Sequence, residues 1–323
     1  MSTMEVSLEK MSVNDSLAGR DFLTLADYTS NELNDLLELA AHLKRKQKLG
    51  HIVQPLKGKV LGMIFEKPST RTRISFETGM YQLGGHAIFL STDDIQLGRG
   101  ETIADTAKVL STYLDSIMIR TFSQCDVEEL AEHASIPVIN GLTDLFHPCQ
   151  VLADLQTIRE QKGSLMGVKM AYIGDGNNMS HSLMIGAAMM GMDICVATPE
   201  QFSPHPDIVN KALQIADSYG GRITQTTSPE EAVQEADVVY TDVWTSMGQE
   251  AEQEEREKAF TDFQVNQKLL SQARPQAIFM HCLPAQRGVE VTAEVIDGEQ
   301  SVVFQQAENR LHAQKALLTS LMS

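Results

Sequence analysis

The chain has 323 residues and a formal net charge of −17 at pH 7. So acidic a surface disfavours nucleic acid and anionic membranes as partners, because both require a basic face. The length exceeds the size at which a single hydrophobic core usually stops growing, so we expect two domains. The four cysteines, at positions 125, 149, 195 and 282, have neither metal-ligand nor disulfide spacing, which predicts a reducing, cytoplasmic location and no zinc site.

The first twenty residues mix acidic and basic side chains and contain no continuous apolar segment. This composition argues against a secretory signal, and the acidic residues argue against a mitochondrial transit peptide. No run of about eighteen apolar residues occurs anywhere, so we expect no membrane span.

Hydrophobic periodicity predicts helices and strands that alternate along the chain. An amphipathic helix over 31–48, with Ser30 as its N-cap, precedes a buried strand over 60–65 and a helix behind it. Further strands are predicted at 86–91, 116–119, 137–140, 168–174, 193–198, 236–241 and 277–282, and further helices at 102–114, 127–133, 148–163, 178–191 and 307–321.

This alternation is typical of an α/β fold with parallel sheets covered on both faces. We therefore predict two doubly wound parallel-sheet domains joined by bridging helices. The first is expected over 1–150, with a C-terminal helix at 305–323 packing back on it, and the second over 151–304.

The segment 65–73, Phe-Glu-Lys-Pro-Ser-Thr-Arg-Thr-Arg, places hydroxyl and basic side chains between the strand at 60–65 and a helix. Ser69 lies at the expected N-cap, where backbone N–H groups lack helical partners and the helix dipole favours an anion. Arg71 adds a bidentate donor. The segment therefore predicts a phosphate site.

Four motifs in chain order resemble those of the carbamoyltransferases, and among them the ornithine carbamoyltransferase family. They are Ser-Thr-Arg-Thr-Arg at 69–73, His-Pro-Cys-Gln at 147–150, the segment from Asp242 to Gly248, and His-Cys-Leu-Pro at 281–284. The resemblance runs from about residue 22 to about residue 318. It implies the transfer of the carbamoyl group of carbamoyl phosphate to the δ-amine of L-ornithine, giving L-citrulline and phosphate.

The resemblance also implies which residues bind carbamoyl phosphate. Arg120 and His147 are implied to stabilise the carbonyl oxygen during attack, as an oxyanion clamp. The full implied set is Ser69, Thr70, Arg71, Thr72, Gln96, Arg120, His147, Gln150, Cys282, Leu283 and Arg310. Gln96 matches a family position that often acts across a subunit boundary.

For L-ornithine the resemblance implies contacts from Asn178, Asp242, Ser246 and Met247. Cys282 is implied to lie beside the attacking amine. Two roles stay open for it: its thiolate removes the amine proton, or it only positions the substrate, together with Asp242, while phosphate is the final proton acceptor.

The resemblance implies no metal and no organic cofactor, a homotrimer or a multiple of trimers, and a role in arginine biosynthesis rather than degradation. Rival hypotheses are a carbamoyltransferase with another acceptor, a non-catalytic relative, and a nucleotide-binding oxidoreductase. The last rests on Gly-Asp-Gly at 174–176 after a strand, which lacks the third glycine of a dinucleotide-binding turn. The charged run at 249–258 is interpreted as a solvated surface.

Overall fold

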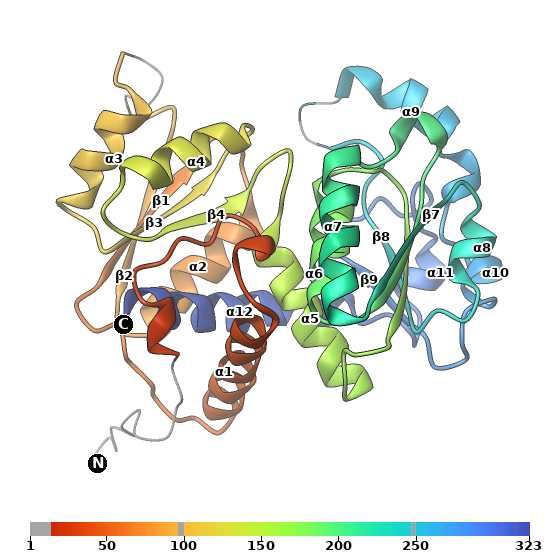
Figure 1. Ribbon diagram of the computed structural model, residues 1–323, viewed down its shortest axis with the longest axis horizontal. Helices are drawn as coiled ribbons and strands as arrows, with labels where there is room; N and C mark the ends of the chain where they lie inside the picture. Colours follow the sequence, from red (N-terminus) through yellow and green to blue (C-terminus); the bar gives the residue numbers. More distant parts are fainter. Residues whose placement is uncertain (1–13, 96–99, 247, 249) are drawn as a thin grey trace. The chain divides into compact units, whose positions relative to one another are not determined.

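The computed structural model describes residues 14–95, 100–246, 248 and 250–323. It divides into two compact units: unit 1 comprises Met1–Gln156 and Glu308–Ser323, and unit 2 comprises Thr157–Ala307. The chain leaves unit 1 within helix α5 (Pro148–Lys162) and returns to it within α12 (Val303–Met322) (Figure 1).

Unit 1 is built on a four-stranded parallel sheet in the order β2-β1-β3-β4. Its strands are β1 (Val60–Phe65), β2 (His86–Ser91), β3 (Ser116–Arg120) and β4 (Val138–Leu142). Its helices, besides its parts of α5 and α12, are α1 (Ser30–Lys48), α2 (Thr70–Gln82), α3 (Ile103–Ser111) and α4 (Gln124–His133), with short 3-10 turns at Asp15–Leu17 and Leu25–Asp27.

Helices cover both faces of this sheet (Figure 1). On one face, Ile64 of β1 and Ile117 of β3 pack with Ala107 of α3 and Val127 of α4 in one apolar core. On the other face lie α2 and α12, and α12 in turn packs on α1 through Ala316. Sandwiching the sheet in this way buries nearly every residue of β1 and β3, which explains their continuous apolar sequences.

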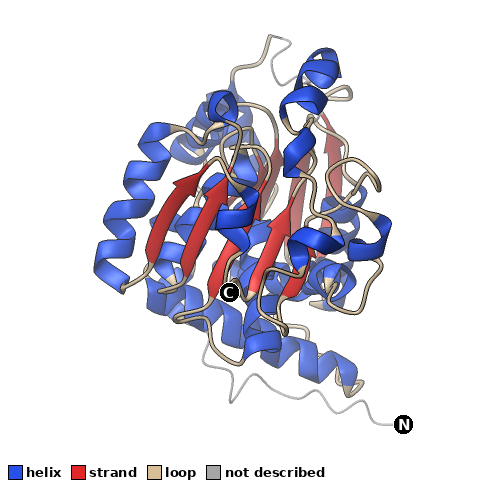
Figure 2. Cartoon of the chain, turned by 90° about the vertical axis from the view of Figure 1, so that its right-hand side faces the viewer, coloured by secondary structure: helices blue, strands red, loops and turns tan. Residues whose placement is uncertain are grey.

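Unit 2 is built on a five-stranded parallel sheet in the order β7-β6-β5-β8-β9. Figure 2 shows strands as red arrows flanked by blue helices. The strands are β5 (Lys169–Ile173), β6 (Asp193–Ala197), β7 (Arg222–Thr226), β8 (Val238–Thr241) and β9 (Ile278–His281). The helices are α6 (Asn178–Met189), α7 (Pro206–Tyr219), α8 (Pro229–Val233), α9 (Gln253–Ala259), α10 (Gln267–Leu270) and α11 (Ala293–Ile296), with 3-10 turns at Glu200–Phe202, Glu250–Glu252 and Thr261–Phe263.

In both sheets the chain begins in the middle and then builds outward to both sides. Unit 1 starts at β1 and unit 2 at β5, so the direction of winding reverses between β1 and β3 and between β5 and β8. At such a reversal the connections leave the carboxyl ends of two adjacent strands in opposite directions, which opens a place for a ligand.

The predicted α/β architecture with two parallel sheets is confirmed. One N-cap prediction is wrong, because α1 is capped by Thr29 rather than Ser30, and Thr29 forms a capping box with Glu32. Strand β7 was not predicted, since it is an edge strand in which only Ile223 is buried and the other side chains are polar. Helix α4 begins at Gln124, three residues earlier than its apolar periodicity indicates, because Ser123 caps a polar first turn.

Phe260 is the centre of the aromatic part of the unit 2 core. Its side chain is fully buried, and its ring centroid lies 5.0 Å from that of Phe202 and 5.7 Å from that of Trp244. We expect Phe260→Ala to lower the free energy of unfolding of unit 2 by about 3–5 kcal/mol, because it removes a large buried ring and leaves a cavity. Urea denaturation followed by fluorescence of Trp244, the single tryptophan, measures this.

The matched control is Phe304→Ala, because the Phe304 side chain is exposed in the same unit. It should change the free energy of unfolding by less than about 0.5 kcal/mol. Equal losses for the two variants would contradict the central packing role of Phe260.

Candidate active site

The end of β1 and the start of α2 form the turn that the sequence predicts to bind phosphate. Ser69 has an extended backbone, and its hydroxyl accepts a hydrogen bond from the Thr72 N–H at 3.2 Å, so Ser69 is the N-cap as predicted. Thr70 is exposed and Arg71 half-buried in the first turn. The first-turn N–H groups and the partial positive charge of the helix end favour an anion there.

Arg310 of α12 joins this turn to α5. Its guanidinium donates to the Gln150 side-chain oxygen at 2.6 Å and to the Thr72 hydroxyl at 3.2 Å. Gln150 in turn donates from its side-chain nitrogen to Asp154 at 2.8 Å. Arg310, Gln150 and Thr72 are all buried, so residues 238 positions apart in the chain are held in one polar cluster.

His147, next to this cluster in the chain, is a buried imidazole held neutral by its surroundings. Burial lowers the pKa of His147 well below its usual value, and the nearby positive charges of Arg310, Arg120 and Arg71 lower it further. Arg120 ends β3 and is itself buried. Three guanidinium groups around a neutral N–H donor form a place for negative charge, such as a phosphate or a carbonyl oxygen during attack.

Two residues that sequence analysis missed hold the strand ends of this cluster in place. The Glu66 carboxylate accepts a hydrogen bond from the Thr121 hydroxyl, and the Glu66 N–H donates to the Arg120 carbonyl at 2.9 Å. The Lys67 ammonium pairs with Asp144 and lies 3.9 Å from the centre of the Phe122 ring. The signal available in the sequence was two adjacent charges directly after a buried strand.

In unit 2, the loops after β5 and β8 meet through Asn177 and Asp242. Asn177 caps α6, accepting from the Met179 and Ser180 N–H groups, and its amide nitrogen donates to Asp242 at 3.2 Å. Asn178, the predicted contact, is the first residue of α6 beside it. Sequence analysis missed Asn177, although an Asn after a strand and before an apolar helix is an N-cap signal.

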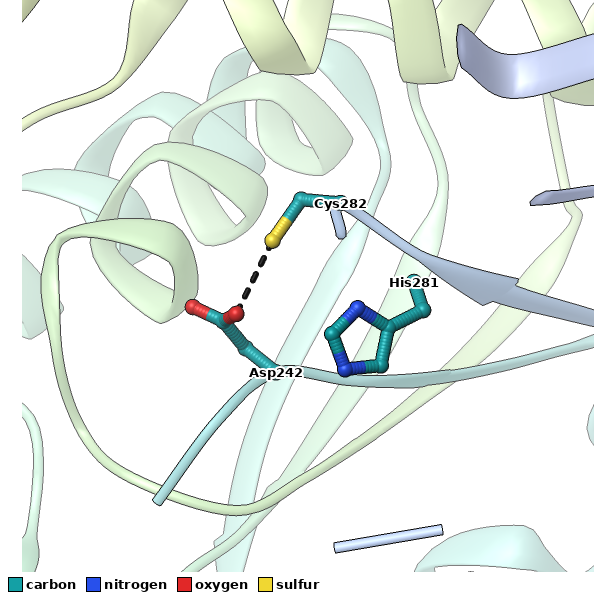
Figure 3. Close-up of side chains that lie close together, drawn as sticks. All are labelled: Asp242, His281 and Cys282. Atoms are coloured by element: carbon teal, nitrogen blue, oxygen red, sulfur yellow. Dashed lines mark hydrogen bonds between the residues drawn. The ribbon is translucent and has the colours of Figure 1, made fainter. Parts of the chain in front are cut away.

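Cys282 directly follows β9, and its thiol donates to the Asp242 carboxylate at 2.9 Å (Figure 3). The Val243 N–H donates to the same carboxylate oxygen at 2.8 Å. The thiol hydrogen therefore lies between the Cys282 sulfur and the Asp242 carboxylate. Such a pair can orient a substrate amine. The carboxylate can accept a proton from the amine, and the sulfur can do so once the thiol has passed its own proton to the carboxylate.

His281 and Leu283 lie on either side of Cys282: the buried Glu290 holds His281, and His281 in turn holds Leu283. The Leu283 N–H donates to Nδ1 of His281 at 2.8 Å, so Nε2 carries the ring hydrogen and faces Glu290 at 3.2 Å. Leu283 has a φ of +58°, which is uncommon for a residue with a branched side chain. These bonds hold the loop that presents the Cys282 thiol.

Asp242, His281 and Cys282 offer potential metal ligand atoms within 4.8 Å of one another. Both ring nitrogens of His281 are already engaged, by the Leu283 N–H and by Glu290. An ion would have to displace one of these bonds, so the cluster fits a metal poorly.

The turn at 174–176 is closed to a dinucleotide phosphate. The Gly176 N–H donates to the Phe202 carbonyl at 2.9 Å, and a Cβ at position 176 would lie 2.3 Å from the Pro204 nitrogen. The 202–204 backbone therefore lies where a pyrophosphate would have to approach.

Most of the predicted residues fall into two groups. Unit 1 brings together Thr72, Arg71, Arg120, His147, Gln150 and Arg310, and unit 2 brings together Asp242, Cys282 and the start of α6. Ser246 is half-buried in the loop after β8. Gln96 and Met247 lie outside the described residues.

Two family descriptions match consecutive parts of the chain, the second of which includes the part of α12 that returns to unit 1. The family description "Aspartate/ornithine carbamoyltransferase, carbamoyl-P binding domain" matches residues 20–160, and "Aspartate/ornithine carbamoyltransferase, Asp/Orn binding domain" matches residues 166–321. The chain belongs to the aspartate/ornithine carbamoyltransferase family.

Several members of this family are similar to the chain over nearly its whole length. The ornithine carbamoyltransferase of Oceanobacillus iheyensis is 67% identical over 322 residues, which cover 100% of this chain and 99% of the relative. The anabolic ornithine carbamoyltransferase of Pyrococcus furiosus is 57% identical over 95% of this chain and 98% of its own. A solved structure of ornithine carbamoyltransferase from Pyrococcus furiosus superimposes with a TM-score of 0.93 at 57% identity, covering 95% of this chain and 98% of that chain.

The charge on His147 provides a test of the unit 1 cluster. We expect the imidazole to be neutral at pH 6.5, and Arg310→Gln to raise its pKa, because a neighbouring positive charge is lost. Since the unfolded chain binds this proton more tightly, the stability that His147 contributes is present above about pH 6.5 and is lost as the pH falls toward the folded pKa. NMR titration of the His147 ring measures the pKa directly.

Arg73→Gln is the control, because Arg73 is a half-exposed arginine on the same helix that pairs with Glu77. It should leave the pKa of His147 unchanged. A His147 ring that is protonated at pH 6.5 in the unmodified protein would contradict the interpretation.

Proposed function

We propose that the chain is an ornithine carbamoyltransferase that acts in arginine biosynthesis. The δ-nitrogen of L-ornithine forms a bond to the carbamoyl carbon of carbamoyl phosphate, the bond from that carbon to the phosphate oxygen breaks, and an amine proton is released. The products are L-citrulline and phosphate. The observation that carries this proposal is the buried cluster of Arg120, His147, Gln150 and Arg310 beside the α2 turn. It is supported by relatives 57–67% identical to the chain that are named ornithine carbamoyltransferase.

Unit 1 is proposed to hold carbamoyl phosphate. Ser69, Thr70, Arg71 and Thr72 would surround the phosphate at the α2 N-terminus, with Arg310 as a further donor. Arg120, His147 and Gln150 would face the carbamoyl group, and Gln96 is proposed as an additional contact. A neutral His147 suits this role because it donates a hydrogen bond without adding a proton to the leaving phosphate.

Unit 2 is proposed to hold L-ornithine through Asn178, Asp242, Ser246 and Met247. The Asp242 carboxylate suits the positive α-ammonium group and disfavours an acceptor such as aspartate, which carries a second carboxylate. Cys282 and Leu283 would lie at the reacting groups. The Cys282–Asp242 hydrogen bond is compatible with both routes for the amine proton. In one, the Cys282 sulfur accepts the proton; in the other, Cys282 and Asp242 only position the amine and phosphate is the final acceptor.

Catalysis by this set of side chains rests on orientation and on electrostatic stabilisation of the oxygen that gains charge. Neither a metal nor an organic cofactor is required in the proposed reaction. A homotrimer or a multiple of trimers is proposed from the family resemblance.

A cytoplasmic location is also proposed, because four free thiols suit a reducing compartment. Within the described parts of the chain, no helix is both long enough and apolar enough to cross a membrane.

The choice of acceptor tests the function. We expect the purified protein to form citrulline from carbamoyl phosphate and L-ornithine, and to give little product with putrescine, N-acetylornithine or aspartate. The expectation follows from the Asp242 carboxylate, which would pair with the α-ammonium group that N-acetylornithine lacks and would repel the second carboxylate of aspartate. It follows also from the loop from Asp242 to Gly248, whose sequence resembles the ornithine motif rather than one suited to putrescine. A colorimetric ureido assay with each acceptor measures the rates. Preference for another acceptor would overturn the assignment of the loop from Asp242 to Gly248, and no product with any acceptor would favour a non-catalytic relative.

Variants of the unit 2 pair test the roles within the site. Cys282→Ala and Asp242→Asn should each lower kcat by roughly 100-fold or more, because they remove groups proposed to orient and deprotonate the amine. Steady-state kinetics with both substrates measures the change. Cys149→Ser is not a suitable control, because Cys149 is buried and its thiol donates to the Asn140 carbonyl at 3.3 Å. The exposed Cys125→Ser is suitable and should retain full activity.

A further inference from the structure

Arg256 is a buried cation that the proposed chemistry does not use. It lies on α9, inside the run at 249–258 that the sequence predicts to be solvated, and this prediction is wrong at Arg256, whose side chain is buried. The run alternates charges with few apolar residues, so periodicity gave no sign that one member faces inward.

The Arg256 guanidinium makes four interactions. One terminal nitrogen, Nη1, lies 3.0 Å from the Asp175 carboxylate and 3.0 Å from the Trp244 carbonyl, and donates to both. Nε donates to Glu252 at 2.9 Å, and the group lies 4.6 Å from the centre of the Phe202 ring. Arg256 and Asp175 are both more than nine-tenths buried, whereas Glu252 is half-exposed.

These contacts connect the two segments proposed to bind L-ornithine. Asp175 lies in the turn after β5, three residues before Asn178. Trp244 lies in the loop after β8, two residues after Asp242 and two before Ser246. One guanidinium therefore fixes the carbonyl of one loop and the carboxylate of the other, while the Tyr172 hydroxyl donates to the Asp175 carbonyl at 2.9 Å.

We propose that Arg256, paired with Asp175, is a positioning residue that sets the separation of the two ornithine-binding loops and thereby the affinity for L-ornithine. The inference rests on the proposed function. Arg256 acts through Asp175 and the Trp244 carbonyl and does not touch the substrate. Its partners belong to unit 2, so the binding of carbamoyl phosphate by unit 1 should not depend on it.

The charge environment makes the pair sensitive to loss of either member. Burial raises the pKa of Asp175 to about 6 although Arg256 opposes this, and the negative charges of Asp242 and Glu252 add to the increase. Without Arg256, Asp175 would keep the burial and both negative neighbours, so it would bind a proton or move toward water. Either change would release the loop after β5 from the loop after β8.

The test compares Arg256→Gln with Glu252→Gln in the full chain. Glu252→Gln removes the exposed partner of the same guanidinium and keeps the buried one. For Arg256→Gln we expect the KM for L-ornithine to rise roughly tenfold or more, with the KM for carbamoyl phosphate unchanged. For Glu252→Gln we expect both constants to stay within about twofold of the unmodified protein.

Two further variants keep the inference testable if Arg256→Gln does not fold. Arg256→Lys keeps the positive charge but loses the planar fork, so it should fold and show a smaller increase in the KM for L-ornithine. Asp175→Asn should raise the same constant. Combined with Arg256→Gln, it should add little, because the two side chains act as one pair.

An unchanged KM for L-ornithine in Arg256→Lys and Asp175→Asn would overturn the inference. Equal increases in both KM values, together with a lower melting temperature, would also overturn it, since they would indicate a structural role alone. Unmodified protein that forms no citrulline would instead overturn the proposed function. The unmodified protein is therefore assayed first.

Discussion

The order of strands in the two parallel sheets constrains everything else in this protein. Each sheet starts in its middle and reverses direction once, between β1 and β3 in unit 1 and between β5 and β8 in unit 2. Because all strands are parallel, the segments that follow them emerge at one edge, and at the reversal two of those segments flank an opening. The Ser69 turn and Arg120 lie at one reversal, and Asn177 and Asp242 lie at the other.

The two units carry opposite charges at these openings. Unit 1 gathers guanidinium groups around a neutral histidine, which suits a phosphate and a carbonyl oxygen that gains charge. Unit 2 presents the Asp242 carboxylate, hydrogen-bonded to the Cys282 thiol, and this pair suits an amine. An acidic chain with a formal charge of −17 thus binds an anion through local geometry rather than through its overall charge.

Buried polar groups in both units are held by partners from distant parts of the chain. Arg310 reaches Gln150 and Thr72 from the last helix, and Arg256 reaches Asp175 from a helix 81 positions away in sequence. A buried charge without such partners would be costly, so each of these bonds also fixes the element that carries it. Stability and the geometry of the site therefore depend on the same contacts, and neither can be altered without affecting the other.

The sequence by itself determined the alternation of helices and strands, the parallel α/β class, the N-cap at Ser69 and the position of the motifs after strands, because periodicity and capping are local signals. It did not reveal the polar edge strand β7, the Asn177 bond to Asp242 or the buried face of α9. These features depend on which strands become neighbours and on which helix covers them. Only the tertiary structure decided that Arg256 meets Asp175 and Cys282 meets Asp242, because the order of strands, rather than local sequence, brings such distant residues together.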